Sequence, residues 1–306
     1  MPEVSAYAPE GVPDVAAGDD LVGLLLPLVD LADGEIVAVT SKVVAKAEGR
    51  VVRGERDDLL PQETVRVVAR RGTTTIVRTR HGLTLAAGGI DASNVARGWV
   101  VLLPEDSDGS ARRVRADIAA RTGRNVGVVV TDTAGRAWRE GQTDIAIGAA
   151  GLRVAEEYAG RVDAHGNELE VTAPAVADEI AGLAELAQGK LSGRPFAVVR
   201  GRADLVLPPG EDGPGAAALV RPEGVDMFGY GAREAVLRAA RGAPADAAPF
   251  GVPVTLPELR RALEDAGLRL DEPRHLPAAR IVAFAHGWRV DEPTRDGDIG
   301  LRPLTT

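Results

Sequence analysis

Residues 128–147, VVVTDTAGRAWREGQTDIAI, decide the fold and the site that we predict for this chain. They begin with Val128-Val129-Val130, a short β-branched run that is typical of a buried strand. The apolar run stops at Thr131-Asp132-Thr133, where a carboxylate stands between two hydroxyls, and Arg136 and Arg139 follow among glycines. A carboxylate at the end of a buried strand, with arginines behind it, can present a hard oxygen ligand or a base beside an anion.

Two other polar clusters are expected to converge on this segment. One is Thr40-Ser41-Lys42 with Lys46, which follows a buried strand predicted at residues 35–39. The other consists of His81 and the glycine-rich run AGGIDASN at residues 87–94. We therefore predict one site at the place where the three segments meet.

Apolar periodicity and turn residues divide the rest of the chain into strands and helices. Helices are predicted at residues 21–31, 61–71, 111–122, 178–188 and 233–241. Strands are predicted at residues 73–80, 100–104 and 195–200. Strands that alternate with helices are typical of an α/β protein, and we predict mixed sheets with flanking helices.

The composition changes at residues 242–249, GAPADAAP, which has the composition of a linker. We therefore predict one domain over residues 1–245 and a small C-terminal extension over residues 246–306. The extension is expected to be a helix–strand appendage, with a helix at residues 257–266 and a strand at residues 279–285.

Composition excludes several classes of protein. The chain has 36 Lys and Arg against 45 Asp and Glu, a net charge of -9, which argues against a general nucleic-acid binder. It has no cysteine, so disulfides, thiolate metal sites and a cysteine nucleophile are excluded. No stretch reads as transmembrane, and no basic region precedes the first apolar run, so we expect a cytoplasmic protein without a membrane partner.

Asp91 and Asp132 are the first candidates for a shared divalent-metal site, with Thr133 adding an oxygen. Capping of a turn or helix is the commoner role of a single aspartate, and two aspartates in loops after strands strengthen the metal interpretation. Ser41-Lys42 with Lys46 suits phosphate binding, and equally suits a solvated helix start. The sequence pattern of a P-loop is absent.

Arg136 and Arg139 suit bidentate binding of a phosphate or carboxylate, and equally suit pairing with surface Glu residues. His81 is a candidate acid or base, or a structural turn residue, while Asn94 either binds a nucleoside or closes an Asx-turn. No G-x-S-x-G motif supports an esterase, and Gly88-Gly89 alone is no dinucleotide fingerprint. Spacing alone therefore predicts a soluble α/β protein, with a metal-dependent enzyme acting on phosphates as the hypothesis.

Together these motifs resemble the F420:γ-glutamyl ligase family, whose members add γ-linked glutamates to the deazaflavin coenzyme F420. The combination of SK…K, RHG…GIDASN and TDTAGRAWREGQTD is the most specific part of the resemblance, which runs collinearly over roughly residues 8–245. The matching stretches are GVPDVAAGDDL (11–21), DGEIVAVTSKVVAKAEGRVV (33–52), RTRHGLTLAAGGIDASNV (78–95), VVVTDTAGRAWREGQTDIAIGAAGL (128–152), ADEIAGLAELAQGK (177–190), RPFAVVRG (194–201) and DMFGYGAREAV (226–236).

The resemblance implies a GTP-dependent ligation in two steps. GTP phosphorylates the terminal carboxylate of F420-0, and the amine of L-glutamate then attacks the acyl phosphate and releases phosphate. The family also implies a divalent metal, Mg²⁺ or Mn²⁺, with GTP as co-substrate, K⁺ as a further candidate cation, and an intertwined homodimer with the family's ligase fold. A divalent metal neutralises phosphate charge in reactions of this kind.

Carried over residue by residue, the resemblance implies Asp91, Asp132 and Thr133 as metal ligands. It implies catalytic or substrate-contacting roles for Asp132, Arg136, Arg139 and His81. The implied contacts to GTP are Ser41, Lys42, Lys46, Asn94, Gly11, Val12, Gly189 and Lys190.

The chain departs from the family pattern at two places. Glu10 lies where the family tends to have an apolar residue, and a carboxylate beside a triphosphate would be unfavourable. Lys190 can contact a phosphate but cannot ligate a metal. Two alternatives therefore stay open: a paralogous ligase that joins an amino acid to another phosphorylated acid, and a catalytically inactive, nucleotide-binding regulatory protein.

Overall fold

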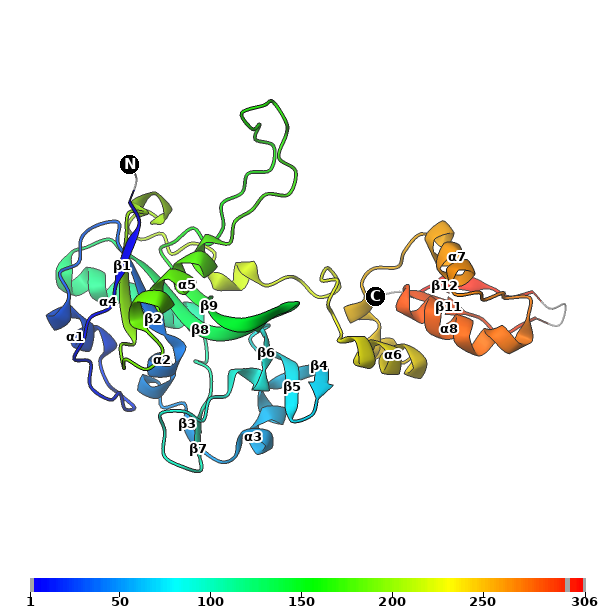
Figure 1. Ribbon diagram of the computed structural model, residues 1–306, viewed down its shortest axis with the longest axis horizontal. Helices are drawn as coiled ribbons and strands as arrows, with labels where there is room; N and C mark the ends of the chain where they lie inside the picture. The colour runs from blue at the N-terminus through cyan, green and yellow to red at the C-terminus, as the bar shows by residue number, and fades with distance from the viewer. Residues whose placement is uncertain (1–2, 295–297, 305–306) are drawn as a thin grey trace. The chain divides into compact units, whose positions relative to one another are not determined.

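The computed structural model describes residues 3–294 and 298–304 (Figure 1). The chain forms two compact units. The first contains the residues up to Val65 and Thr79–Val220, and the second contains Arg66–Arg78 and the residues from Arg221 onward. This division describes how the chain packs. It does not test the predicted domain over residues 1–245, which stays a prediction.

A five-stranded sheet forms the centre of the first unit. Its strands, in spatial order, are β1 (Ser5–Tyr7), β10 (Phe196–Arg200), β2 (Ile36–Thr40), β8 (Gly127–Arg136) and β9 (Arg139–Ala150). Only β2 and β8 run parallel, while the other neighbours are antiparallel. The middle strands are continuous apolar runs because both faces of the sheet are covered.

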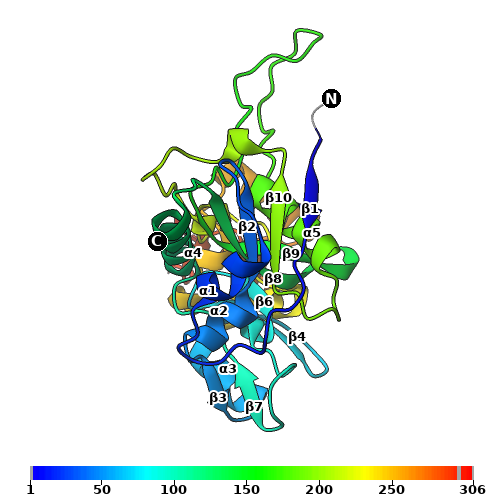
Figure 2. The ribbon, with the colours of Figure 1, turned by 90° about the vertical axis from the view of Figure 1, so that its left-hand side faces the viewer.

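Helices cover the two faces of this sheet. They are α1 (Leu21–Leu25), α2 (Ser41–Ala47), α4 (Ser107–Thr122) and α5 (Val176–Gln188). Val128 and Val130 of β8 belong to the same apolar cluster as Ile118 of α4, whereas Val129 packs in another cluster with Ile180 of α5. Figure 2 shows α4 and α5 on opposite sides of the sheet. Successive residues of β8 therefore face α4 and α5 in alternation.

Shorter elements complete the first unit. They are α3 (Arg56–Glu63), β3 (Val51–Arg53), β6 (Thr84–Ala86) and β7 (Trp99–Val101). Strands β3 and β7 pair antiparallel, and residues 87–98 between β6 and β7 form the glycine-rich loop. Asp91 in this loop makes an isolated antiparallel bridge with Val101, so that the loop is anchored to β7.

The second unit has its own small core. Its elements are β5 (Thr74–Thr79) with most of β4 (Thr64–Arg71), α6 (Ala232–Arg241), α7 (Leu256–Asp265), α8 (Leu276–Ala285), β11 (Trp288–Val290) and β12 (Leu301–Pro303). Leu259 and Leu263 of α7 pack with Leu276 and Ala279 of α8. Strands β11 and β12 pair antiparallel.

The predicted fold class, an α/β protein with mixed sheets and flanking helices, is confirmed. Two segment predictions are wrong. The predicted helix at 61–71 is instead the end of α3 followed by strand β4, because Thr64-Val65 and Val67-Val68 are β-branched and favour a pleated strand. The predicted strand at 279–285 lies in helix α8, where Ala279 and Ala283 recur at helical spacing on the buried face.

Two element ends also differ from the prediction. The helix predicted at 21–31 ends at Leu25 and tightens to a 3₁₀ turn over Leu26–Leu28, where Pro27 cannot donate a helical hydrogen bond. The strand at Val128 does not stop at Thr131 but continues to Arg136, so Asp132 lies within β8 and not in a loop after it. No helix in residues 3–294 and 298–304 has the length and apolar character needed to cross a membrane.

Arg115 of α4 ties the sheet to the segment at 207–212, and we expect its loss to be costly. Arg115 is 5% exposed, and it donates to the carbonyls of Val126, Pro208 and Glu211 at 2.9–3.1 Å. Arg115→Met should lower the free energy of unfolding by about 3 kcal/mol, because these carbonyls lose their charged donor. Urea unfolding followed by circular dichroism measures the change.

The control is Arg112→Met on the same helix, where the exposed guanidinium pairs with Asp106. We expect that change to stay within about 0.5 kcal/mol. Equal stability of the two variants would contradict a structural role for Arg115.

Candidate functional site

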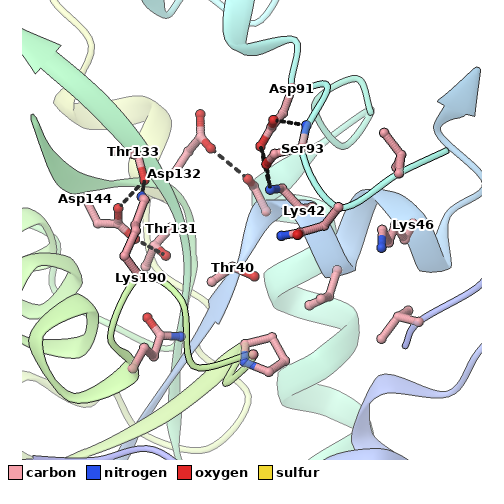
Figure 3. A pocket seen from close by; sticks show the side chains of 18 of the residues that line it. Thr40, Lys42, Lys46, Asp91, Ser93, Thr131, Asp132, Thr133, Asp144 and Lys190 are labelled. Carbon is pink, nitrogen blue, oxygen red and sulfur yellow. Dashed lines mark hydrogen bonds and ion pairs between the residues drawn. The ribbon is translucent and has the colours of Figure 1, made fainter. Parts of the chain in front are cut away.

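The first unit contains a cavity of about 1170 Å³ at the end of the β2–β8 pair (Figure 3). The pairing of β2 with β8 ends at Thr40 and Thr131, where β2 turns into α2. The walls come from this turn, the glycine-rich loop, the middle of the β8–β9 hairpin and the C-terminal end of α5. The three polar clusters predicted to converge from the sequence therefore supply side chains to one cavity, with His81 as the exception described below.

Asp132 is the most deeply buried carboxylate that the sequence analysis predicted. Ser41 at the start of α2 donates a hydrogen bond to Asp132 Oδ1 at 3.0 Å. Burial raises the pKa of Asp132 to about 7, and the charge of Asp144 adds to this rise, while the Ser41 hydrogen bond opposes it. A cation beside Asp132 would relieve this unfavourable burial of negative charge.

Asp91 approaches the same region from the glycine-rich loop. Lys42 Nζ lies 2.6 Å from Asp91 Oδ2 and donates to Ser93 Oγ at 2.6 Å. The Ser93 backbone N–H donates to Asp91 Oδ1 at 2.6 Å. Burial alone would raise the pKa of Asp91, but hydrogen bonds from Lys42 and Ser93 outweigh it and lower that pKa. Asp91 is therefore ionised and has an ammonium as its partner.

Thr133 faces away from Asp132, because neighbouring side chains of a strand point to opposite faces. It lies opposite Asp144 of β9 and donates to Asp144 Oδ1 at 2.7 Å, while Thr131 donates to Oδ2 at 3.0 Å. Lys190 Nζ donates to Thr133 Oγ1 at 2.6 Å, as Figure 3 shows. The two predicted metal ligands in β8, Asp132 and Thr133, therefore lie on opposite faces of the strand.

The donors in the cavity suit a hard divalent cation. Asp91 and Asp132 offer carboxylate oxygens, and hydroxyls of Ser41 and Ser93 lie next to them. In the described part of the chain, no three His, Asp or Glu side chains gather closely enough to hold a metal by themselves. Mg²⁺ commonly uses one or two protein carboxylates and completes its shell with waters and substrate phosphates, so the residues present fit such an ion.

The remaining predicted contacts divide into those that line the cavity and those that do not. The lining includes Ser41, Lys42, Lys46, Asn94, Val12, Gly189 and Lys190, but not Gly11. Glu10, the unfavourable departure from the family pattern, forms an ion pair with Arg194, which itself lines the cavity. Its charge is thereby compensated by an arginine.

Arg136, Arg139 and His81 do not line the cavity. Both arginines lie near the exposed tip of the β8–β9 hairpin, where Arg136 donates to the carbonyl of Glu140. His81 is half-buried beside Arg80, and both of its ring nitrogens lack a hydrogen-bond partner among the described residues. Burial, followed by the charge of Arg80, lowers the pKa of His81. Their predicted roles at the substrates stay predictions.

The lining residues that sequence reasoning did not single out include Asp144 and Glu185, while Gln188 was named only as the start of a turn, 188–195, that the resemblance implies near GTP. Asp144 belongs to the GQTD part of the quoted motif, but it pairs with Thr133 only because the register shifts between Gly135 and Arg136, which alternation alone does not predict. Glu185 and Gln188 are three residues apart on α5, a spacing that puts both on one face. No short motif marks them, because their position depends on how α5 packs on β9.

A sequence model of the family described as F420-0:Gamma-glutamyl ligase matches residues 11–64 and 58–201, which is more than half of the chain. The chain belongs to this family. The resemblance inferred from the motifs is thereby confirmed. The match spans every segment that lines the cavity, so the cavity is part of the family domain.

Three relatives agree with this membership. A protein of Archaeoglobus fulgidus is 39% identical over 220 residues, with 65% of this chain and 88% of the relative covered. One of Methanothermobacter thermautotrophicus is 36% identical over 255 residues, covering 74% and 98%. One of Halobacterium salinarum is 38% identical over 222 residues, covering 64% and 86%. Each bears the name coenzyme F420:L-glutamate ligase.

The raised pKa of Asp132 predicts how stability depends on pH in metal-free protein. The folded-state pKa of about 7 lies above the ordinary value of 3.8, so the folded protein binds this proton more tightly than the unfolded chain. Stability should therefore fall as pH rises from about 4 to about 7, by at most about 4 kcal/mol. Asp132→Asn should remove this contribution.

Urea unfolding in EDTA at pH 5 and pH 7.5 measures the effect. Asp117→Asn changes a surface carboxylate of α4 that pairs with Arg121, and it should keep the wild-type difference between the two pH values. The same pH dependence in Asp132→Asn as in wild type would contradict the raised pKa.

Proposed function

We propose that the chain is a ligase of coenzyme F420 biosynthesis, which joins L-glutamate to F420-0 with GTP as the phosphate donor. Family membership and the names of three relatives support the ligase activity. The observation that carries the proposal is the convergence of Asp91 and Asp132 with Lys42, Lys46 and further cations on one cavity, an arrangement suited to a metal-bound phosphate.

The proposed chemistry follows from the poor reactivity of a carboxylate toward an amine. A carboxylate oxygen of F420-0 attacks the γ-phosphorus of GTP, GDP leaves, and the acyl phosphate has phosphate as a good leaving group. The amine of L-glutamate then attacks the acyl carbon, and phosphate departs as the amide forms. A bound divalent cation would supply charge neutralisation at the phosphates.

The chain's own residues have separate roles in this proposal. Asp91 and Asp132 would hold the divalent cation, and Lys42 and Lys46 would bind phosphate oxygens. Ser41 would keep Asp132 oriented through the hydrogen bond at 3.0 Å. When nucleotide and metal bind together, the ammonium of Lys42 can leave Asp91 and contact a phosphate oxygen. The carboxylate of Asp91 is then free to hold the cation.

The cavity is also large enough for the proposed reactants. At about 1170 Å³ it exceeds the range of about 300–1,000 Å³ usual for one small ligand. Five lysines and arginines line it, namely Lys42, Lys46, Arg56, Lys190 and Arg194. Five carboxylates line it as well, namely Asp14, Asp91, Asp132, Asp144 and Glu185. Such a mixed lining suits anions that enter with a metal, together with a reactant that carries an amine.

Mass spectrometry tests the reaction directly. Protein incubated with F420-0, GTP, L-glutamate and Mg²⁺ or Mn²⁺ should form a product heavier by one or more glutamyl units. Omission of GTP, of metal or of L-glutamate should abolish it. With F420-0 labelled by ¹⁸O in its terminal carboxylate, one labelled oxygen should appear in the released phosphate. Product without labelled phosphate would contradict the acyl phosphate, and no product at all would contradict the ligase.

Asp132→Asn should lower kcat/KM about a thousandfold or more, because the neutral amide binds a divalent cation poorly. The fold should remain, since the amide keeps the shape of the side chain and can still accept from Ser41. Asp117→Asn serves as the matched control and should leave the rate unchanged. Wild-type activity of Asp132→Asn at saturating metal would exclude Asp132 as a metal ligand.

A further inference from the structure

A second cluster of side chains lies on the α5 face of β8, away from Asp132. It consists of Thr133, Asp144 and Glu185, and we call it the acceptor cluster. All three residues line the cavity, and Asp144 is only 5% exposed. The metal-binding role proposed for Asp91 and Asp132 does not use Asp144 or Glu185, so their arrangement calls for a separate explanation.

Thr133 presents only lone pairs to the cavity. A hydroxyl has one proton and two acceptor lone pairs. The proton of Thr133 is directed to Asp144 Oδ1 at 2.7 Å, and Thr131 occupies Oδ2 of the same carboxylate at 3.0 Å. Asp144 is therefore a positioning residue, which keeps the hydroxyl of Thr133 from donating to a ligand.

Glu185 is also held in place, with one oxygen on the backbone and the other on an ammonium. Its Oε2 accepts from the backbone N–H of Asp144 at 3.1 Å. Its Oε1 lies 3.6 Å from Lys190 Nζ, and the same ammonium donates to Thr133 at 2.6 Å. The acceptor cluster thus already binds one primary ammonium. Because the cluster offers acceptors alone, it suits a cationic group, and the contacts of Lys190 favour a second primary ammonium.

Gln188 provides an independent sign of a ligand. It lies one turn after Glu185 on α5, lines the cavity and is only 4% exposed. Its buried Nε2 has no hydrogen-bond partner among residues 3–294 and 298–304. A buried donor without a partner is unfavourable, and an acceptor on a ligand would satisfy it. Ammonium acceptors next to an unpaired amide donor match the two charged ends of an amino acid.

We propose that the acceptor cluster binds the amino group of the incoming L-glutamate, and that Gln188 donates to one of its carboxylates. This assignment rests on the proposed ligation, in which the amine is the nucleophile. It places the amine on the α5 face of β8, opposite the face on which Asp132 meets Ser41.

Lys190 occupies the amine position until it is displaced. Its side chain is 62% exposed and reaches the cluster from the turn after α5. Phosphates of a bound nucleotide would attract this ammonium away from Thr133 and Glu185, since they carry more negative charge. The amino acid would then enter a cluster that has lost its cation, so nucleotide binding should strengthen L-glutamate binding.

Calorimetric titration tests the amine assignment without turnover. L-Glutamate and glutarate, which has the same two carboxylates and no amine, are titrated into protein with GDP and Mg²⁺. Wild type should bind L-glutamate more tightly than glutarate. Glu185→Gln should raise the Kd for L-glutamate about tenfold or more and leave that for glutarate within about twofold. The glutamine can still accept from the Asp144 N–H, so the local fold should remain.

Glu179→Gln is the matched control, because Glu179 is exposed on the same helix and does not line the cavity. It should leave both dissociation constants unchanged. A second variant, Lys190→Ala, should lower the Kd for L-glutamate in protein without nucleotide, because the competing ammonium is gone. An increase of that Kd in Lys190→Ala would contradict displacement.

Two results would overturn the assignment. One is a Kd for L-glutamate that stays within about twofold in Glu185→Gln. The other is that Glu185→Gln binds fewer Mn²⁺ ions than wild type, as counted by electron paramagnetic resonance. The cluster would then be a metal subsite with Thr133 as a ligand. Binding of L-glutamate through its amine without any F420 product would contradict the proposed function and leave this assignment standing.

Discussion

The parallel pairing of β2 with β8 is the constraint on which the site depends. It ends at Thr40 and Thr131, and beyond that point β8 continues paired with β9, while β2 has turned into α2. The chain can therefore place polar side chains on a strand whose preceding residues are fully buried. Asp132 lies just past this end, close enough to the core that its carboxylate is desolvated and open enough to meet a ligand.

Charge in the cavity is balanced locally and not by the protein as a whole. The chain carries a net charge of -9, yet the cavity sets ammonium and guanidinium groups against carboxylates. Asp91 has Lys42 as its partner, Glu185 has Lys190, and Glu10 has Arg194. Each partnership can be exchanged for a contact to an anionic ligand, because a lysine or arginine can turn to a phosphate. An acidic protein can bind anions in this way.

The sequence predicted β2, β10 and the start of β8, because runs such as 35–39 and 195–200 are short, apolar and bounded by turn residues, but it predicted neither β1 nor β9. It failed at β4 and α8, where the local composition suits both a helix and a strand and the packing determined which one forms. Asp132 was predicted as a site residue because it follows an apolar run, and Asp91 because it lies among polar residues in a glycine-rich loop. Glu185 was not predicted, since its hydrogen bond to the Asp144 backbone N–H joins segments far apart in the chain and leaves no periodic signal.

The register of the β8–β9 hairpin has a consequence for how its sequence can change. Val130 pairs with Gly148 and Thr131 with Ala146, so Ile147 is an extra residue on β9 that has no partner. This bulge keeps Asp144 on the same face as Thr133. Insertion or deletion of one residue between Val130 and Asp132 would exchange the two faces of β8. Thr133 would then lie on the face that Asp132 now occupies, and Asp132 on the other. The segment can therefore diverge in composition far more freely than in length.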